Sequence, residues 1–283
     1  MKRSKKILII TLVVFFVLCH IDLRPWFYEL EEKYINPIDE TRKSYDAGSC
    51  KNMQNDLCYY IIYLNDNESK WNEDDKKIFV KKKFIPSMKY LSQQASAYNI
   101  SLTTEYKTFP DNDSQISYNG IIETEVVKNG SQKDIFSQVA ESMGYNSPKE
   151  MNKSLQKELN VKQIAYLIVV NKEGRSYKHT YIESHREKYE FCVFFSKSIG
   201  HTDSTCYSTI AHEILHLFGA EDYYDPFGNY PEREKLALSL YPDDIMLSTV
   251  EDINTVKVGE YTAYSVGWTD ILPEECNVDK WWK

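Results

Sequence analysis

The stretch Ser208–Tyr223, which reads STIAHEILHLFGAEDY, decides the fold, because it predicts a helix that is both a core element and a source of ligands. Residues four apart lie on one face of a helix, so His212 and His216 can direct two imidazole nitrogens to one point. Neutral imidazole is a preferred ligand of zinc. Apolar residues also recur at helical spacing, at Ile210, Ile214 and Leu217. The stretch therefore predicts a packed helix that also binds a metal ion.

Three further positions complete the predicted site. Glu213 follows the first histidine directly, which places a carboxylate beside the metal rather than on it. Gly219 tolerates the left-handed backbone conformation that ends a helix, so the chain can turn back there and offer Asp222 as a third ligand. We therefore predict that His212, His216 and Asp222 hold Zn²⁺ and that Glu213 is the catalytic base.

The pattern His-Glu-x-x-His-x-x-Gly-x-x-Asp in His212–Asp222 resembles the zinc signature of the metzincin metallopeptidases, in the variant whose third ligand is aspartate, as in snapalysin-type enzymes. Those enzymes carry a methionine turn beneath the metal, a few tens of residues after the signature, and Met246 lies in such a stretch, Asp243–Ser248. The resemblance implies an α+β, metzincin-like zincin domain with a mixed twisted sheet, long helices, an active-site helix and a Met-turn.

One position departs from the resembled pattern. Some metzincins have a tyrosine two residues after the methionine that helps to stabilise the transition state, and this position is Ser248 here. The sequence offers four other candidates for stabilising the oxyanion: Tyr223, Tyr224, Tyr261 and Tyr264.

The resemblance implies a zinc-dependent endopeptidase that hydrolyses peptide bonds of extracellular proteins or peptides. A metal-activated water would attack the peptide carbonyl, while Glu213 accepts the proton of that water and passes it to the leaving amine. The predicted partner is accordingly a peptide or protein substrate.

Two alternatives remain open. A gluzincin-type peptidase would take a downstream glutamate, such as Glu232 or Glu251, as its third ligand, although Gly219 and Met246 argue against it. A membrane-anchored binding or adhesion protein would use zinc structurally. Structural sites usually close all four metal positions with protein ligands, and no fourth ligand is evident at suitable spacing.

Composition narrows the classes of protein further. A chain of 283 residues with 42% hydrophobic and 14% aromatic residues is long and apolar enough for one sizeable catalytic domain. Its formal net charge of −8 argues against a nucleic-acid partner, because phosphate binding requires a basic face. The sequence says nothing about the oligomeric state.

Residues 1–24 have the pattern of a targeting segment. The basic stretch Lys2–Lys6 precedes an apolar run from Ile7 to Cys19, which is short for a membrane-spanning helix, and no small-residue cleavage site follows. We predict an uncleaved signal anchor, with a cleaved signal peptide and a lipidated cysteine as alternatives. The anchor would make the membrane a partner and give a single-pass cell-membrane protein with its catalytic domain outside the cytoplasm, whereas cleavage would give a secreted protein.

The rest of the chain divides into two segments. Residues 25–55 are charged and lack periodicity, which predicts a stalk or short pro-segment, and residues 56–283 form the predicted catalytic domain. Within that domain, Leu57–Leu64 and Ile164–Val170 are continuous apolar runs that predict buried strands. Apolar residues at helical spacing over Glu73–Tyr98 predict a long helix, which Pro86 kinks or restarts.

Two features leave choices that the sequence does not resolve. In the resembled family, an edge strand just before the zinc helix borders the substrate groove, and either Glu190–Phe195 or Tyr177–Ile182 can supply it. In an oxidising compartment Cys50 can pair with Cys58, and Cys192 with Cys206, although the connectivity is not deducible.

Overall fold

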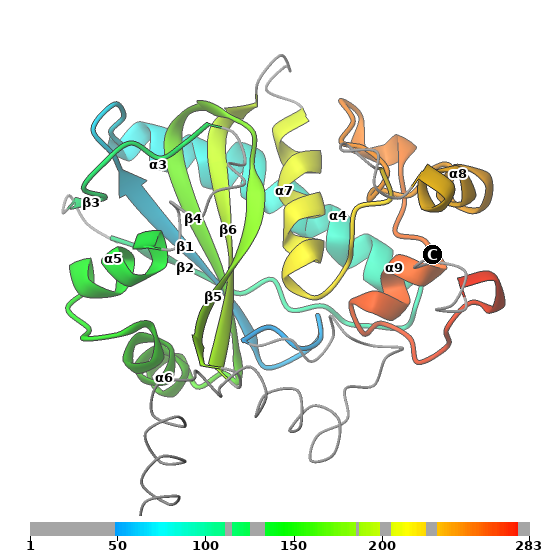
Figure 1. Ribbon diagram of the computed structural model, residues 1–283, viewed down its shortest axis with the longest axis horizontal. Coiled ribbons are helices and arrows are strands. Elements are labelled where there is room, and N and C mark those ends of the chain that lie inside the picture. Colours follow the sequence, from blue (N-terminus) through cyan, green and yellow to red (C-terminus); the bar gives the residue numbers. More distant parts are fainter. Residues whose placement is uncertain are drawn as a thin grey trace, which may run out of the picture. The chain divides into compact units, whose positions relative to one another are not determined.

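The computed structural model of the protein describes residues 49–110, 115–124, 134–184, 187–198, 205–224 and 231–276 (Figure 1). All of them belong to one of the two units into which the chain divides, residues 41–283. The predicted targeting segment, residues 1–24, and most of the predicted stalk lie outside the described residues.

A mixed sheet of six strands forms the centre of the described part, as the prediction of a mixed sheet with helices requires. The strands follow the order β2-β1-β4-β6-β5, and β3 also pairs with β1. Every pairing is parallel except the antiparallel one between β5 and β6. The strands are β1 (Leu57–Asn65), β2 (Tyr106–Phe109), β3 (Ile116–Ser117), β4 (Gln163–Gly174), β5 (Tyr177–Ser184) and β6 (Glu187–Ser198).

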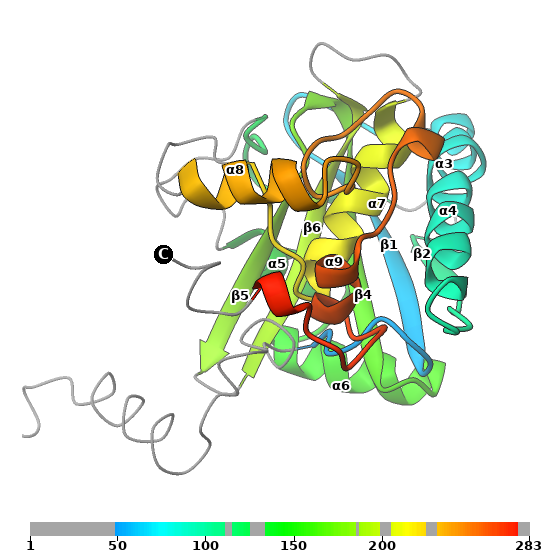
Figure 2. The same cartoon turned by 90° about the vertical axis from the view of Figure 1, so that its right-hand side faces the viewer.

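Helices cover both faces of this sheet (Figures 1 and 2). On one face lie α3 (Glu73–Phe79), α4 (Ile85–Ser96) and α7 (Thr205–Leu217), and on the other lie α5 (Asp134–Ser142) and α6 (Pro148–Leu159).

The side chains of β1 alternate between these two layers, with Tyr59 and Ile61 in the first core cluster and Tyr60 and Ile62 in the second. Every residue of β1 is therefore buried, which explains why its sequence is continuously apolar.

The predicted long helix is confirmed as one helical run that Pro86 interrupts. Helix α3 begins after Asn72, whose side chain accepts a hydrogen bond from the Asp75 amide. A π-helical turn, Val80–Phe84, links α3 to α4, and Pro86 lies in the first turn of α4. Because proline has no N–H, the regular hydrogen-bond ladder cannot continue through it, and the wider π turn lies where the ladder is broken.

The segment after α7 lies beside that helix (Figure 1). It contains α8 (Pro231–Leu240), α9 (Glu260–Ser265) and the single 3₁₀ turns Ile253–Thr255 and Glu274–Cys276.

Residues 49–53, which fall within the predicted stalk, are anchored to the same unit as the sheet. Cys50 and Met53 are fully buried in the core. The Met53 amide donates to the Val266 carbonyl at 2.9 Å, and the Trp268 indole donates to the Met53 carbonyl at 2.9 Å. We call Ser49–Met53 the N-terminal strap.

Neither of the two cysteine pairings that the sequence left open is formed, and the side chain of Cys206 lies outside the described residues. Cys50, Cys58 and Cys192 are buried free thiols, as is Cys276. The thiols of Cys50 and Cys192 instead donate to the carbonyls of Ile164 at 3.4 Å and Glu213 at 3.0 Å.

The prediction of a single-pass membrane protein is also corrected. Within the described part of the chain, no helix combines the length and the apolar character needed to span a bilayer. The segment on which that prediction rested, residues 1–24, lies outside the described residues.

Candidate metal centre

Side chains of β6 and α4 hold helix α7 in place by hydrogen bonds to its backbone carbonyls. These contacts do not involve the side chains of His212 and His216. The Cys192 thiol of β6 donates to the Glu213 carbonyl at 3.0 Å, and the Ser87 hydroxyl of α4 donates to the Tyr207 carbonyl at 2.8 Å. Strand β6 and helix α4 thus set the position of the stretch His212–His216.

The helix ends as the glycine predicted. Gly219 has a φ of 107°, in the left-handed region. The Ala220 amide donates to the Leu215 carbonyl and the Gly219 amide donates to the His216 carbonyl, both at 3.2 Å. This pair of bonds is a Schellman motif, which closes a helix and reverses the chain. The reversal brings Asp222 back over the last turn of α7.

The three predicted ligands meet at one point. His212 Nε2 lies 3.0 Å and His216 Nε2 lies 3.1 Å from Asp222 Oδ1, and the two Nε2 atoms are 3.1 Å apart. Ligand atoms about 2.0–2.1 Å from a tetrahedral zinc ion are roughly 3.3 Å from one another. The triangle therefore has nearly the dimensions of one face of a zinc site, and its three residues are a possible metal-binding group.

Backbone carbonyls orient both imidazoles. His212 Nδ1 lies 2.9 Å from the Ile245 carbonyl, and His216 Nδ1 lies 2.7 Å from the Ala220 carbonyl. Since a carbonyl only accepts hydrogen bonds, each Nδ1 must carry a proton, and loss of the proton from Nε2 would leave a lone pair there for a metal ion.

A tight turn around Met246 contacts the residues of the centre. The Leu247 amide donates to the Asp244 carbonyl at 3.0 Å, and the Met246 amide donates to Asp244 Oδ1 at 2.8 Å. The turn holds His212 through the Ile245 carbonyl, and its Met246 carbonyl accepts from the Tyr223 amide at 3.0 Å. Met246 itself is fully buried.

Glu213 lies in the same helix but is not one of the three clustered ligands. Its side chain is buried, and its Oε2 has no hydrogen-bond partner among the described residues. Burial raises the pKa of Glu213, and the charges of His216 and His212 offset only part of that rise. A buried carboxyl oxygen without a partner is costly and is typical of functional sites.

His212 and Asp222 shift the pKa of each other. Burial alone would lower the pKa of His212, but its hydrogen bond with Asp222 and the Asp222 charge raise it to about 9. Burial would raise the pKa of Asp222, but the charge of His216 and the hydrogen bond with His212 hold it well below its usual range. Asp222 is therefore ionised across the physiological range and attracts a cation.

Of the four candidate tyrosines, Tyr224 contacts one of the clustered histidines. Its ring stacks on the His212 ring, with centroids 6.4 Å apart and an interplanar angle of 25°. Burial raises the pKa of Tyr224 to about 12, so its hydroxyl remains protonated. Tyr223 is buried and its hydroxyl lies 2.6 Å from Thr262 Oγ1, and the two remaining candidates, Tyr261 and Tyr264, are also buried.

Sequence reasoning missed one residue of this centre, Arg175. Its Nη2 donates to the Tyr224 hydroxyl at 3.3 Å. Arg175 lies between β4 and β5, far from the zinc signature in sequence, and no local pattern marks it.

The described residues give no support to a downstream glutamate as third ligand. Glu251 is exposed and does not belong to the clustered group, and the side chain of Glu232 lies outside the described residues.

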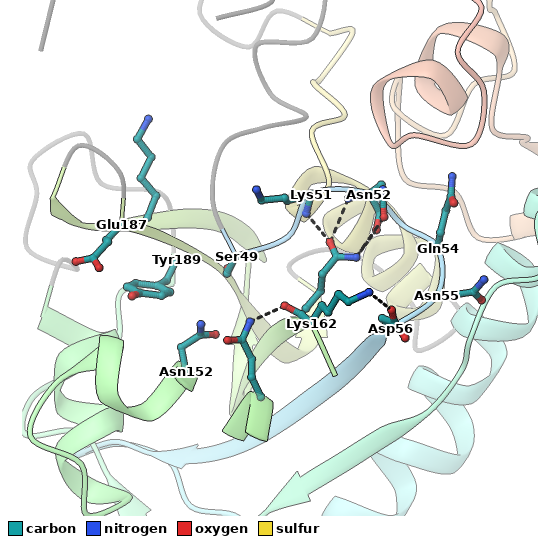
Figure 3. Close-up of a pocket in the computed structure, with 13 residues that line it drawn as sticks. Ser49, Lys51, Asn52, Gln54, Asn55, Asp56, Asn152, Lys162, Glu187 and Tyr189 are labelled. Atoms are coloured by element: carbon teal, nitrogen blue, oxygen red, sulfur yellow. Dashed lines mark hydrogen bonds and ion pairs between the residues drawn. The ribbon is translucent and has the colours of Figure 1, made fainter. Parts of the chain in front are cut away.

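A pocket of about 620 Å³ lies where β4 begins, and Figure 3 shows the residues that line it. The strap residues Ser49, Lys51 and Asn52 line it together with Gln163, whose side-chain oxygen accepts from the Lys51 and Asn52 amides. None of the three clustered ligands lines this pocket.

Comparison of the chain with protein-family models, with curated proteins and with solved structures finds no match.

Proposed function

We propose that the protein is a zinc-dependent endopeptidase that hydrolyses peptide bonds of protein or peptide substrates. The observation that carries this proposal is the juxtaposition of the His212–His216–Asp222 triangle with the buried, unpartnered Oε2 of Glu213. Two imidazoles and one carboxylate suit zinc, and three protein ligands leave a position open for chemistry. A structural zinc site would need a fourth protein ligand, which the described residues do not place in the cluster.

The arrangement of elements also supports a metzincin-like fold. Helix α7 follows the last strand of a mixed sheet in the chain, and the Ile245 carbonyl next to Met246 contacts His212 of that helix. Of the two strands that the sequence left as candidates for the border of the groove, β5 forms the edge of the sheet and β6 lies inside it. The resemblance thus assigns the substrate border to β5.

In the proposed mechanism, His212, His216 and Asp222 would hold the zinc ion. When bound, zinc would polarise the scissile carbonyl and acidify water. Glu213 accepts the proton of the attacking water on its free oxygen and donates it to the leaving amine, and its raised pKa favours the second transfer. The Tyr224 hydroxyl donates a hydrogen bond to the carbonyl oxygen as negative charge develops there, and Arg175 helps to orient it.

Metal analysis combined with a casein-cleavage assay tests this function. We expect one zinc ion per chain, cleavage of unfolded casein, loss of cleavage on chelation and recovery when zinc is added back. A protein that binds zinc tightly but cleaves neither casein nor a mixed peptide library would contradict the proposal and favour a structural zinc.

A further inference from the structure

Arg175 occupies a corner of the fold that is fixed from two sides. Its backbone amide donates to the Thr124 carbonyl at 2.8 Å. The preceding residue, Gly174, packs so closely on the Phe195 ring that an added Cβ would lie 2.4 Å from it. The backbone therefore presents the Arg175 side chain at a defined place, directly before the edge strand β5.

The guanidinium group lies beside the metal centre. It donates to Tyr224, whose ring stacks on the metal-ligand candidate His212. The hydrogen bond to Tyr224 and the negative charges of Asp222 and Glu213 raise the pKa of Arg175. The side chain is nevertheless solvent-exposed, so a bound substrate can reach it.

The hydrogen bond to Tyr224 uses only one of the N–H donors of the Arg175 guanidinium. A guanidinium has five N–H donors in a planar fork that matches a carboxylate. Within the described part of the chain, Tyr224 is its one hydrogen-bond partner. The chain as a whole has a net charge of −8, which repels an anionic substrate. A fixed cation at this point offsets that repulsion locally.

We propose that Arg175 determines substrate specificity by binding a carboxylate of the substrate. The carboxylate can belong to an acidic side chain near the scissile bond or to the C-terminus of the peptide. This inference rests on the proposed peptidase function and names the substrate class of the same site.

Binding of matched peptides to the full-length, zinc-loaded Glu213→Gln protein tests the inference without turnover. In one arm, a C-terminally amidated peptide carries either glutamate or glutamine, placed at successive positions. In the other arm, the same neutral peptide ends in a free acid or an amide. Fluorescence anisotropy gives each Kd, and the arm that shows a preference identifies the source of the carboxylate.

We expect at least one carboxylate peptide to bind about tenfold tighter than its amide partner, the value for a charge-assisted hydrogen bond at an exposed site. Arg175→Ala should abolish this preference while amide peptides still bind. Lys82→Ala, which removes the same charge from an exposed position in the π turn, should leave the preference intact.

Tyr224→Phe separates recognition from positioning, because it removes the hydroxyl that Arg175 contacts and keeps the guanidinium. We expect the carboxylate preference to persist in this variant. Its loss, equal weakening of both peptide classes by Arg175→Ala, or the absence of any preference would overturn the inference. In each of those cases, cleavage of amide peptides by the unmodified protein would leave the proposed function standing, whereas failure to cleave any peptide would count against that function alone.

Discussion

At the scale of single residues, Glu213 is distinctive because its Oε2 is buried and has no hydrogen-bond partner among the described residues. Glu213→Gln keeps the size and shape of the side chain but cannot accept a proton. We expect this variant to retain zinc and fold while cleavage falls by about 10²–10⁴-fold, the usual contribution of a general base. Zinc content and kcat measured on the same preparation check this, and near-normal turnover by the zinc-loaded variant would contradict it.

Asp222 and its neighbour Glu221 form a matched pair of acidic residues. Only Asp222 belongs to the clustered ligands, with its Oδ1 3.0 Å and 3.1 Å from the two imidazoles. Asp222→Ala should weaken zinc binding by at least about 100-fold, because the loss of a ligand costs more than the loss of an outer contact. Glu221→Ala should bind zinc almost normally. Competition titration against a chelator measures both affinities, and the reverse ranking would refute the assignment.

Zinc binding should depend on pH through His212. Its pKa is raised to about 9, so most His212 is protonated at neutral pH when no metal is bound, and zinc must displace that proton. In the metal-free protein, the interaction of protonated His212 with Asp222 stabilises the fold. This stabilisation is complete below the pKa of histidine in the unfolded chain, about 6.5, and is lost as the pH rises through the pKa of His212 in the folded protein, about 9.

The affinity for zinc should therefore rise between pH 6 and pH 9, with about one proton released per ion near neutrality. Calorimetry in buffers of different ionisation enthalpy counts the protons. An affinity that falls over this range would show that His212 is not a ligand.

At the scale of elements, strand β6 holds the N-terminal strap through one carboxylate. Glu190 Oε2 accepts from the Ser49 amide at 2.8 Å, the Ser49 hydroxyl at 2.9 Å and the Cys50 amide at 3.2 Å. Its Oε1 is buried without a hydrogen-bond partner among the described residues. Glu190 thus stabilises the fold by accepting three hydrogen bonds from the strap.

Glu190→Ala leaves these buried donors unpaired and should lower the free energy of unfolding by about 2–4 kcal/mol. Glu190→Gln keeps an acceptor oxygen, loses the buried charge, and should remain close to the unmodified protein. Urea denaturation of both variants measures the difference. Equal losses would indicate that the charge, not the acceptor, holds the strap.

At the scale of the whole molecule, the three proposed ligands are close in sequence, but a residue that orients one of them is distant. The ligands come from α7 and the turn after it, and the Ile245 carbonyl from the Met246 turn holds His212. Zinc should therefore stabilise the entire unit by mass action, by about 2.7 kcal/mol when its free concentration is 100 times its Kd.

Thermal unfolding with and without zinc tests this stabilisation. Calcium, which prefers oxygen ligands, should raise the Tm little. Asp222→Ala should lose most of the effect of zinc, and an undiminished rise of the Tm in this variant would place the bound zinc elsewhere.

The sequence by itself determined the features that depend on local patterns. The apolar run of β1, the helical spacing from Glu73 onward and the ligand spacing of His212 and His216 each reflect the geometry of a single element. The positive φ of Gly219 followed in the same way, because glycine adopts this conformation at little cost. The triad of His212, His216 and Asp222 could therefore be predicted before any tertiary contact was known.

Only the tertiary structure decided which residues surround that triad. In the sequence, Tyr224 was one of four tyrosines that could equally stabilise the oxyanion, and no pattern marked Arg175 as a residue of the site. The strap belonged to a charged segment that resembled a stalk. The short β2 and the edge position of β5 likewise depend on which strand lies alongside which. All of these features come from contacts between segments far apart in the chain, such as Arg175 with Tyr224 and Ser49 with Glu190. Such contacts leave no periodicity in the sequence, because their energy depends on where the chain returns rather than on the spacing of neighbouring residues.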